Sequence, residues 1–239
     1  MSRVAALIVN FNMPERTDLL VEAIGDKADA IVIDNGSDIQ PPSKYTKVKL
    51  ERNVQTTGGW LAGLEAVKGK YEYYWFLITS TRIPGGDVLT PMVEFMDANP
   101  DAVGIHPSLT AESTTGWPHL KNRGTNEVRR TWMIDNIASL YRSDWFDSIG
   151  WFDPAYTYAW GIDLETCYRA RKQGRGIYID DRVQVEKITN VGYSMNRMNM
   201  SSDERGRLAY ANMMEVGRRK HGERFWELMT AEAIPDEWK

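Results

Sequence analysis

The sequence predicts a single α/β domain in which an open, mostly parallel sheet carries helices on both faces. Continuous apolar runs at 4–9, 30–33 and 73–78 are typical of strands that are buried on both sides. Helical segments separate these runs, as the connections of parallel strands require. Each run ends in polar residues, namely Asn10, then Asp34 and Asn35, then Thr79 to Arg82. Ligands of such sheets bind beyond the carboxyl ends of the strands, so we expect the functional site there.

The elements of the first hundred residues follow in order. A helix is expected at 14–24, because Pro14 suits a first helical position and Leu19, Leu20 and Ala23 share a face. A short strand follows at 48–50. A loop at Thr56-Thr57-Gly58-Gly59 then leads into a helix at 60–67. Asp87 is expected to cap the helix that runs on to Met96.

The remaining residues are less regular. Strands are expected at 102–105, 137–141, 177–179 and 183–185, with a long polar loop at 108–130. Asp163 and Gly174 bracket a helix at 164–173, and 203–230 has a helical pattern. No repeat or linker interrupts the chain. We divide it into a nucleotide-binding half (1–100), an acceptor and catalytic half (101–200) and a C-terminal helical segment (201–239).

Composition excludes several classes of protein. The 239 residues carry 29 Lys and Arg against 33 Asp and Glu, a net charge of −4, and this argues against a nucleic-acid partner. One cysteine rules out an intramolecular disulfide framework, and three scattered histidines disfavour a His-cluster zinc site. The first apolar run is too short for a transmembrane segment and lacks a signal-peptide pattern. We expect a cytoplasmic protein. A basic group near the C-terminus could close over the pyrophosphate, make peripheral contact with an anionic membrane surface, or simply form the solvated face of a helix; it comprises Arg197, Arg205, Arg207, Arg218, Arg219 and Lys220.

Four blocks of the chain resemble glycosyltransferase family 2, in its rhamnosyltransferase-like branch. They are Leu7-Ile-Val-Asn-Phe-Asn12, Val32-Ile-Asp-Asn-Gly-Ser37, the stretch from Asn53 through Gly58-Gly59 to Gly63, and the block from Gly150-Trp-Phe-Asp153 to Ala170. Each block alone is weak, but the four occur in the family's order over residues 4–190. The resemblance implies a GT-A fold and an inverting transfer of sugar from a nucleoside diphosphate.

The first three blocks predict the nucleotide site. Asp34 and Asn35 offer acceptors to the donors of a nucleoside, with Val9 and Asn10 flanking them and Asn53 nearby. The alternative is that Asp34 and Asn35 only form an Asx-turn. Gly58 and Gly59 permit close backbone approach to phosphate at a helix start, or else they form a plain tight turn.

The fourth block predicts the catalytic residue. Through the resemblance, Asp163 takes the place of the family's general base, which removes the proton of the acceptor hydroxyl. Asp163 also suits the N-cap of its helix, and both roles are compatible. We assign Trp160, Thr81 and Glu165 to the sugar or acceptor. Trp160 stands out among nine tryptophans, because indole faces stack on the C–H faces of sugars.

The sequence departs from the family where a metal ion would bind. The carboxylates of the usual motif are replaced by Thr79, Ser80 and Thr81, and Lys187 stands near the position of the family's metal-ligand histidine. Arg82 and Lys187 therefore stand where positive charge is needed by the leaving pyrophosphate, unless they are merely solvated surface charges. We predict that no cofactor is required. The alternative is Mn²⁺ or Mg²⁺ at a non-standard site using Glu165, Asp180, Asp181 or Glu186.

These features predict an inverting hexosyltransferase of polysaccharide or glycan biosynthesis. A nucleotide sugar, by family habit a UDP-sugar, would donate to a hydroxyl of a saccharide or glycoconjugate. A degenerate, non-catalytic nucleotide-sugar or carbohydrate-binding protein is the first alternative. A nucleotidyltransferase is the second, although the segment after the first strand lacks the Gly-rich basic loop expected of one.

Overall fold

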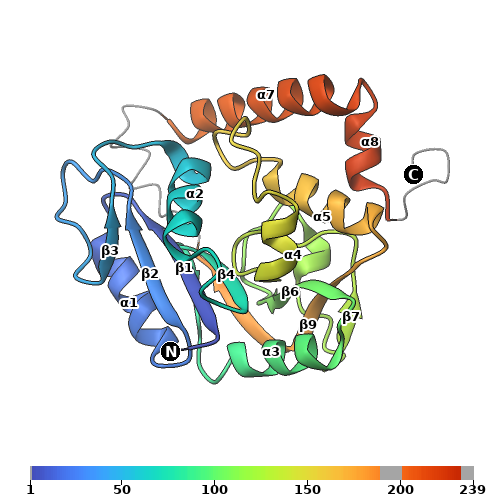
Figure 1. The fold of residues 1–239 in the computed structure, drawn as a ribbon, viewed down its shortest axis with the longest axis horizontal. Helices are drawn as coiled ribbons and strands as arrows, with labels where there is room; N and C mark the ends of the chain where they lie inside the picture. Colours follow the sequence, from blue (N-terminus) through green and yellow to red (C-terminus); the bar gives the residue numbers. More distant parts are fainter. Residues whose placement is uncertain (1, 189–200, 233–239) are drawn as a thin grey trace.

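The computed structural model describes residues 2–188 and 201–232, built around one nine-stranded sheet (Figure 1). The strand order is β3-β2-β1-β4-β8-β6-β9-β5, and β7 pairs with β9 outside this path. The strands are β1 (Val4–Asn10), β2 (Asp29–Asp34), β3 (Thr46–Lys49), β4 (Tyr73–Ile78), β5 (Thr81–Arg82), β6 (Ala102–Leu109), β7 (Val128–Arg130), β8 (Leu140–Arg142) and β9 (Gly176–Lys187). The helices are α1 (Pro14–Ile24), α2 (Gln55–Val67), α3 (Leu89–Ala98), α4 (Ser143–Ser148), α5 (Ile162–Lys172), α7 (Ser202–His221) and α8 (Phe225–Thr230), with a 3₁₀ turn at Pro118–Leu120.

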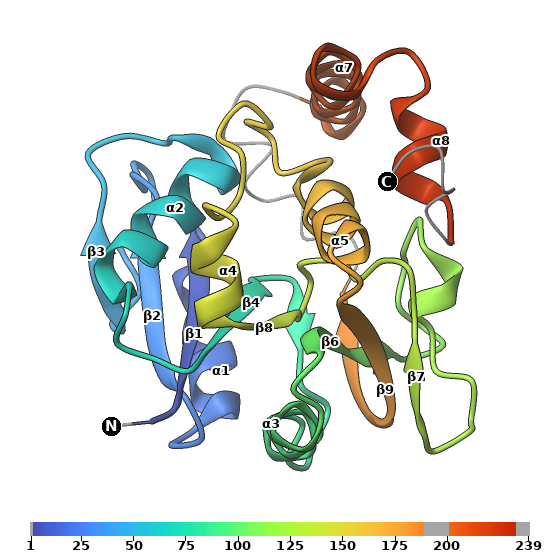
Figure 2. The same cartoon turned by 45° about the vertical axis from the view of Figure 1, so that its right-hand side comes forward.

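The first half of the sheet is parallel, as predicted. β1 pairs in parallel with both β2 and β4, and β2 pairs in parallel with β3. Helices α2 and α1 lie on opposite faces of these strands (Figure 2). Gly63 permits the close approach of α2, because a Cβ there would come within 2.7 Å of the Ile33 side chain. The carboxyl ends of β1, β2 and β4 therefore meet at one edge.

The second half of the sheet is mixed rather than parallel. β8 runs antiparallel to both β4 and β6, and β9 is antiparallel to β5 and β7. β9 is one strand of 12 residues, not the two short ones predicted, and its pairing with β6 shifts register near Pro107. Because β8 is reversed, its start lies at the edge where β4 ends. The residues just before β8 therefore lie at the functional edge, whereas in a parallel sheet they would lie at the opposite edge.

Three predicted helix boundaries were wrong. Helix α2 begins at Gln55, so Gly58 and Gly59 lie inside it rather than in a loop before it. Gly161, with φ of 93°, precedes α5 in the left-handed conformation, so Asp163 is a residue of the first turn and not the N-cap. The C-terminal helical pattern is broken at Gly222 into α7 and α8. Neither these helices nor any other in residues 2–188 and 201–232 is long and apolar enough to cross a membrane.

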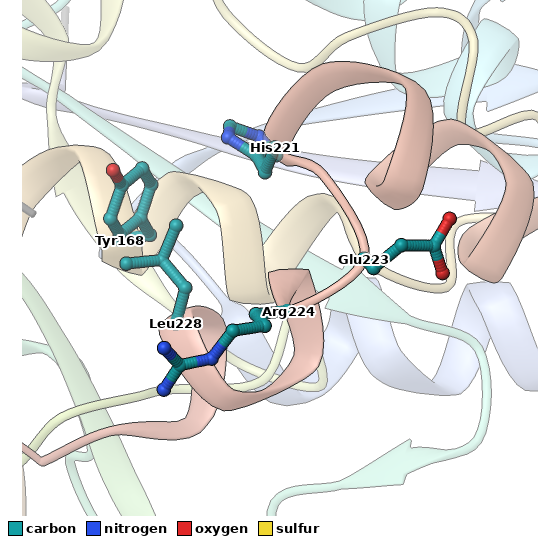
Figure 3. Close-up of a pocket in the computed structure, with 5 residues that line it drawn as sticks. All are labelled: Tyr168, His221, Glu223, Arg224 and Leu228. Carbon is teal, nitrogen blue, oxygen red and sulfur yellow. The ribbon is translucent and has the colours of Figure 1, made fainter.

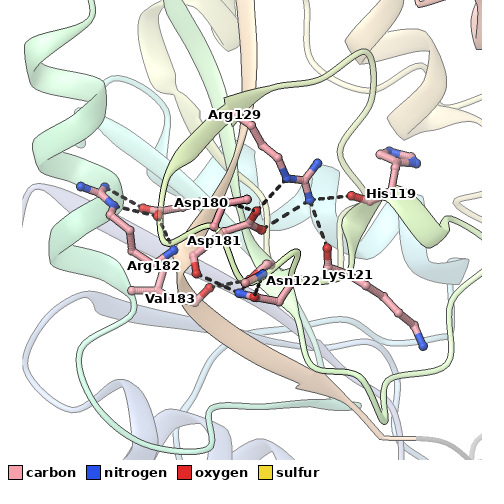
Figure 4. A network of polar contacts seen from close by, with 11 residues as sticks. His119, Lys121, Asn122, Arg129, Asp180, Asp181, Arg182 and Val183 are labelled. Atoms are coloured by element: carbon pink, nitrogen blue, oxygen red, sulfur yellow. Dashed lines mark hydrogen bonds and ion pairs between the residues drawn. The ribbon is translucent and has the colours of Figure 1, made fainter.

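A polar network fixes the long loop at 110–130 against β9 (Figure 4). Arg129 pairs with the fully buried carboxylate of Asp181 at 3.0 Å and donates to the carbonyls of His119 and Lys121. Arg182 holds the buried carboxylate of Asp180 at 2.8 Å. These pairs use the charges of Asp180 and Asp181 within the fold, so the two residues do not act as free metal ligands.

Candidate functional site

A cavity of about 120 Å³ lies at the carboxyl edge of the parallel strands. Its walls come from the ends of β1, β2 and β4, from the start of α2 and from α7. Val9, Asn35 and Asn53, three of the predicted nucleotide-binding residues, line it together, along with Trp60, Thr79 and Arg205. The structure thus brings residues from distant parts of the chain to the edge where a ligand was expected.

Asn10 and Asp34 lie beneath this cavity and are fully buried. The Asn10 amide donates to Asp34 at 2.9 Å, while its Oδ1 accepts from the Met13 backbone N–H and the Thr17 hydroxyl. Both oxygens of Asp34 also accept from Ser37. Asp34 therefore forms the Asx-turn that was the alternative, and we correct its assignment from nucleoside contact to scaffold, together with that of Asn10.

Asn35 holds the start of α2 beside the cavity. Its amide donates to Asn53 Oδ1 and to the Gln55 carbonyl, and its Oδ1 accepts from the Val54 N–H. Gln55 has φ of 63°, a strained conformation for a non-glycine residue. Asn53 Oδ1 accepts from the Gln55 N–H at 2.7 Å, Val54 itself makes no side-chain cap bond, and the first turn of α2 contains no acidic residue. The cavity wall here presents backbone N–H groups rather than carboxylates.

Gly58 and Gly59 have packing roles inside α2. A Cβ on Gly59 would come within 2.8 Å of the Val9 side chain, and one on Gly58 equally close to Val54. Small residues are thus needed because α2 presses on β1 and on its own start. The predicted loop is thus part of the helix, and contact of the two glycines with phosphate stays a prediction.

Asp163 faces a second carboxylate, Asp135, which the sequence analysis missed. The Ile134 N–H donates to the Cys167 sulfur at 3.4 Å, and Cys167 lies one turn beyond Asp163 on α5. On the other side, the Thr81 hydroxyl donates to the Ile137 carbonyl at 2.8 Å, and Thr81 pairs with Lys187 in the β5–β9 ladder. The segment 134–137 is held from both sides, and the charge of Asp135 interacts with those of Asp163 and Lys187.

Burial and mutual repulsion perturb this pair of carboxyls. Burial raises the pKa of Asp163 well above its usual range, and the neighbouring charge of Asp135 raises it further. Burial also raises the pKa of Asp135, against the opposing attraction of Lys187. A carboxyl whose pKa is moved toward neutrality is suited to proton transfer at physiological pH.

Three other predicted residues are engaged within the fold. Glu165 is buried on α5, where Arg169 at 2.6 Å and Lys220 from α7 neutralise its carboxylate, so it is not free to bind sugar as predicted. Thr81 is buried and its hydroxyl is used by Ile137, which likewise excludes the predicted contact with sugar. Arg82 is exposed and pairs with Glu186 across the β5–β9 ladder.

Trp160 lies three residues before Asp163 with 44% of its surface exposed. Ala159, at φ of 68°, and Gly161, at 93°, both adopt the left-handed conformation on either side of it. The Thr57 hydroxyl of α2 donates to the Tyr156 carbonyl at 2.5 Å, so this segment is anchored to the nucleotide-binding half. An exposed indole at this position is available to a ligand beside Asp163.

Positions 79–81, where the family's metal motif would fall, carry hydroxyl side chains in place of carboxylates. The described residues contain no group of three or more His, Cys, Asp or Glu that could hold a metal ion. Thr79 and Thr81 direct their hydroxyls to Met13 and Ile137, and Lys187 adds a positive charge. The four carboxylates proposed as alternative ligands, Glu165, Asp180, Asp181 and Glu186, all pair with arginine or lysine.

A larger cavity of about 460 Å³ lies at the corner between α7 and α8 (Figure 3). Tyr168, His221, Glu223, Arg224 and Leu228 line it. None of the predicted site residues faces this space. Its position on the helical side of α5, rather than at the ends of the strands, separates it from the candidate site.

Two solved structures resemble the chain over nearly its whole length. GalNAc-T7, solved with UDP, GalNAc and Mn²⁺, superposes with a TM-score of 0.66 at 12% identity, covering 98% of this chain and 55% of its own. The mannosyltransferase PcManGT from Pyrobaculum calidifontis, solved with GDP-Man and Mn²⁺, gives 0.57 at 12% identity, covering 95% and 73%. The fold is the GT-A glycosyltransferase fold. This chain spans little more than half the length of the GalNAc-T7 chain.

The sequence relatives found are uncharacterised proteins, so they do not indicate an activity. Uncharacterized protein Rv1525 of Mycobacterium tuberculosis and uncharacterized protein Mb1552 of Mycobacterium bovis are each 26% identical over 232 residues, which is 89% of this chain and 83% of theirs. No family model matches the sequence.

Proposed function

We propose that the protein transfers a glycosyl group from a nucleoside-diphosphate sugar to a hydroxyl of a saccharide or glycoconjugate, with inversion at the anomeric carbon. The observation that carries this proposal is the juxtaposition, at the strand edge of a GT-A fold, of a carboxyl pair, a lysine and a cavity lined by Asn35 and Asn53. Membership of glycosyltransferase family 2 and of its rhamnosyltransferase-like branch remains a prediction, as do a UDP donor and a hexosyl group.

The reaction is a single displacement. Asp163 takes the proton of the acceptor hydroxyl as the acceptor oxygen forms a bond to the anomeric carbon. The bond from that carbon to the phosphate oxygen breaks, and the nucleoside diphosphate leaves with the electron pair. Because the attacking oxygen approaches opposite the leaving group, the configuration inverts. The raised pKa of the Asp163 carboxyl makes it a stronger base than an ordinary aspartate.

Lys187 supplies positive charge where the leaving diphosphate gains negative charge. Among the described residues it forms no ion pair of its own, whereas Arg82 is bound to Glu186. Preorganised positive charge of this kind stabilises the transition state without a bound cation. We therefore propose transfer that does not depend on a divalent metal ion, with Trp160 stacking on the sugar or acceptor. Residues 1–100 would bind the donor and 101–200 the acceptor.

A panel of donors tests the proposal directly. Purified protein is incubated with UDP-, GDP-, dTDP- and CDP-sugars, with Mn²⁺ or with chelator, and release of the nucleoside diphosphate is measured. We expect release from one nucleotide class under both conditions, and its loss in Asp163→Asn. Nucleotide binding without release would instead favour the non-catalytic alternative. Activity that disappears in chelator and returns with Mn²⁺ would contradict metal independence alone. A parallel incubation with nucleoside triphosphates is the control, and turnover in that incubation alone would indicate a nucleotidyltransferase.

A further inference from the structure

Helix α7 contributes a charged side chain, Arg205, to the wall of the cavity at the strand edge. The other residues of that wall are apolar or uncharged, and they come from the first eighty residues of the chain. Figure 1 shows α7 crossing over the molecule, with its first turns above α2. Arg205 therefore joins the C-terminal part of the chain to the nucleotide-binding half.

Arg205 lies on the face of α7 that packs inward. Ala209, Met213 and Val216 are all buried and follow Arg205 at helical spacing, and this stripe ends at Lys220. Such a stripe normally consists of apolar side chains. Arg207, two residues further along, points away from the stripe and is exposed. Of these two arginines of α7, only Arg205 faces inward.

The charge of Arg205 has no counterpart in the described part of the chain. There, its guanidinium forms no ion pair and no side-chain hydrogen bond, whereas the half-buried Arg129 and Arg169 pair with Asp181 and Glu165. Burial lowers the pKa of Arg205, as expected for a cation that is removed from water without a carboxylate beside it. A half-buried cation of this kind, aimed at a cavity, calls for an anionic ligand.

Several contacts hold α7 in this position. Lys220 pairs with Asp153 at 2.5 Å and with the buried carboxylate of Glu165. The Asn212 amide donates to the Ala155 carbonyl at 3.0 Å. These contacts attach the helix to α5 and to the segment that precedes Asp163. Arg205 is therefore carried on a rigid element that is anchored beside the catalytic residue.

We propose that Arg205 binds the diphosphate of the nucleotide donor and that α7 is a wall of the donor site. The planar guanidinium donates two parallel N–H bonds to phosphate oxygens, a geometry that lysine cannot reproduce. The inference rests on the proposed function, since it takes the cavity to be the donor site. It assigns to the C-terminal helix a direct part in recognising the phosphates rather than the base.

Calorimetric titration of the full chain tests this inference, using UDP, GDP, dTDP and CDP and the four corresponding nucleosides. For the diphosphate that binds the wild-type protein, we expect Arg205→Gln to weaken affinity about 10- to 100-fold, in the range of a lost charged hydrogen bond. The affinity for the matching nucleoside should be unchanged. Arg205→Lys should recover only part of the loss. Arg207→Gln, on the same helix, should bind as the wild type does.

Each outcome separates this inference from the proposed function. If no diphosphate binds the wild-type protein, the proposed function fails and Arg205 loses its ligand with it. If a diphosphate binds the wild-type protein and Arg205→Gln equally well, the donor site stands but the assignment of Arg205 is overturned. Equal losses of nucleoside and diphosphate binding, with a lowered melting temperature, would also overturn it, because they indicate displacement of α7 rather than loss of a phosphate contact.

Discussion

Two aspartates at the same edge of the sheet, Asp34 and Asp163, have opposite surroundings. Asp34 is fully buried, and both of its oxygens accept hydrogen bonds from Asn10 or Ser37. Asp163 is half-buried and accepts from its neighbouring Leu164 N–H, and the charge nearest to it is a second carboxylate. A carboxylate whose hydrogen bonds are satisfied by the fold stabilises that fold. One that lies beside a like charge, with its pKa raised, retains the capacity to accept a proton.

Of the substitutions that test this difference, Asp163→Asn is expected to have the largest effect, and that effect is on turnover. Asp163→Asn keeps the size of the side chain but removes the base, so we expect turnover to fall roughly 10²- to 10⁴-fold, the usual contribution of general acid–base catalysis. The stability should be retained or increased, because a buried charge beside Asp135 is removed. Initial rates and thermal melts measure the two quantities. Turnover close to that of the wild type would remove Asp163 from the mechanism.

Asp34 should show the reverse behaviour. Asp34→Ala leaves the buried amide of Asn10 without its acceptor, and we expect the free energy of unfolding to fall by about 2–4 kcal/mol. Denaturant titration measures this loss. Ser37→Ala is a milder variant, since it removes the hydroxyl bond to Asp34 but keeps the backbone N–H bond and the buried carboxylate. A stable Asp34→Ala protein that no longer binds nucleoside would restore Asp34 as a direct ligand.

The sequence could predict the parallel half of the fold because its strands are continuous apolar runs with polar ends. It could not predict Asp135, because that position depends on strand direction. Residues 137–141 suggest a strand, but only its antiparallel pairing with β4 brings the residues before it to the functional edge. The sequence also could not show that α2 begins at Gln55, which places Gly58 and Gly59 inside the helix. The packing of Gly59 against Val9 is a tertiary contact that the sequence does not reveal. The sequence placed Arg205 in a basic group that could reach the pyrophosphate, but a helical pattern alone does not say which member of the group faces inward.

Removal of the charge of Asp135 should shift the pH dependence of activity. Burial is the first cause of the raised pKa of Asp163 and Asp135 is the second, so Asp135→Asn removes one of the two. The pKa of Asp163 falls, the base stays deprotonated to lower pH, and the acid limb of kcat/KM moves to lower pH. A pH–rate profile tests this, with Asp147→Asn, a carboxylate that contacts Tyr74 and Trp151, as control. An unchanged acid limb would mean that the two carboxyls do not interact.

The smallest effect on stability and activity is expected from substitution of Arg82. This prediction applies to basic residues the comparison between a charge that is paired within the fold and one that is not. Its guanidinium is paired with Glu186 and 61% of its side chain is exposed. Exposed pairs contribute about 0.2–1 kcal/mol, so Arg82→Gln should change the free energy of unfolding by no more than that. The charge of Arg82 is already neutralised by Glu186, whereas Lys187 and Arg205 form no ion pair within the described residues. We therefore expect the donor KM to rise less in Arg82→Gln than in Lys187→Met. Initial rates at varied donor concentration compare the two. A larger rise in Arg82→Gln would mean that the diphosphate displaces Glu186 and that the unpaired cations are not the ones that bind it.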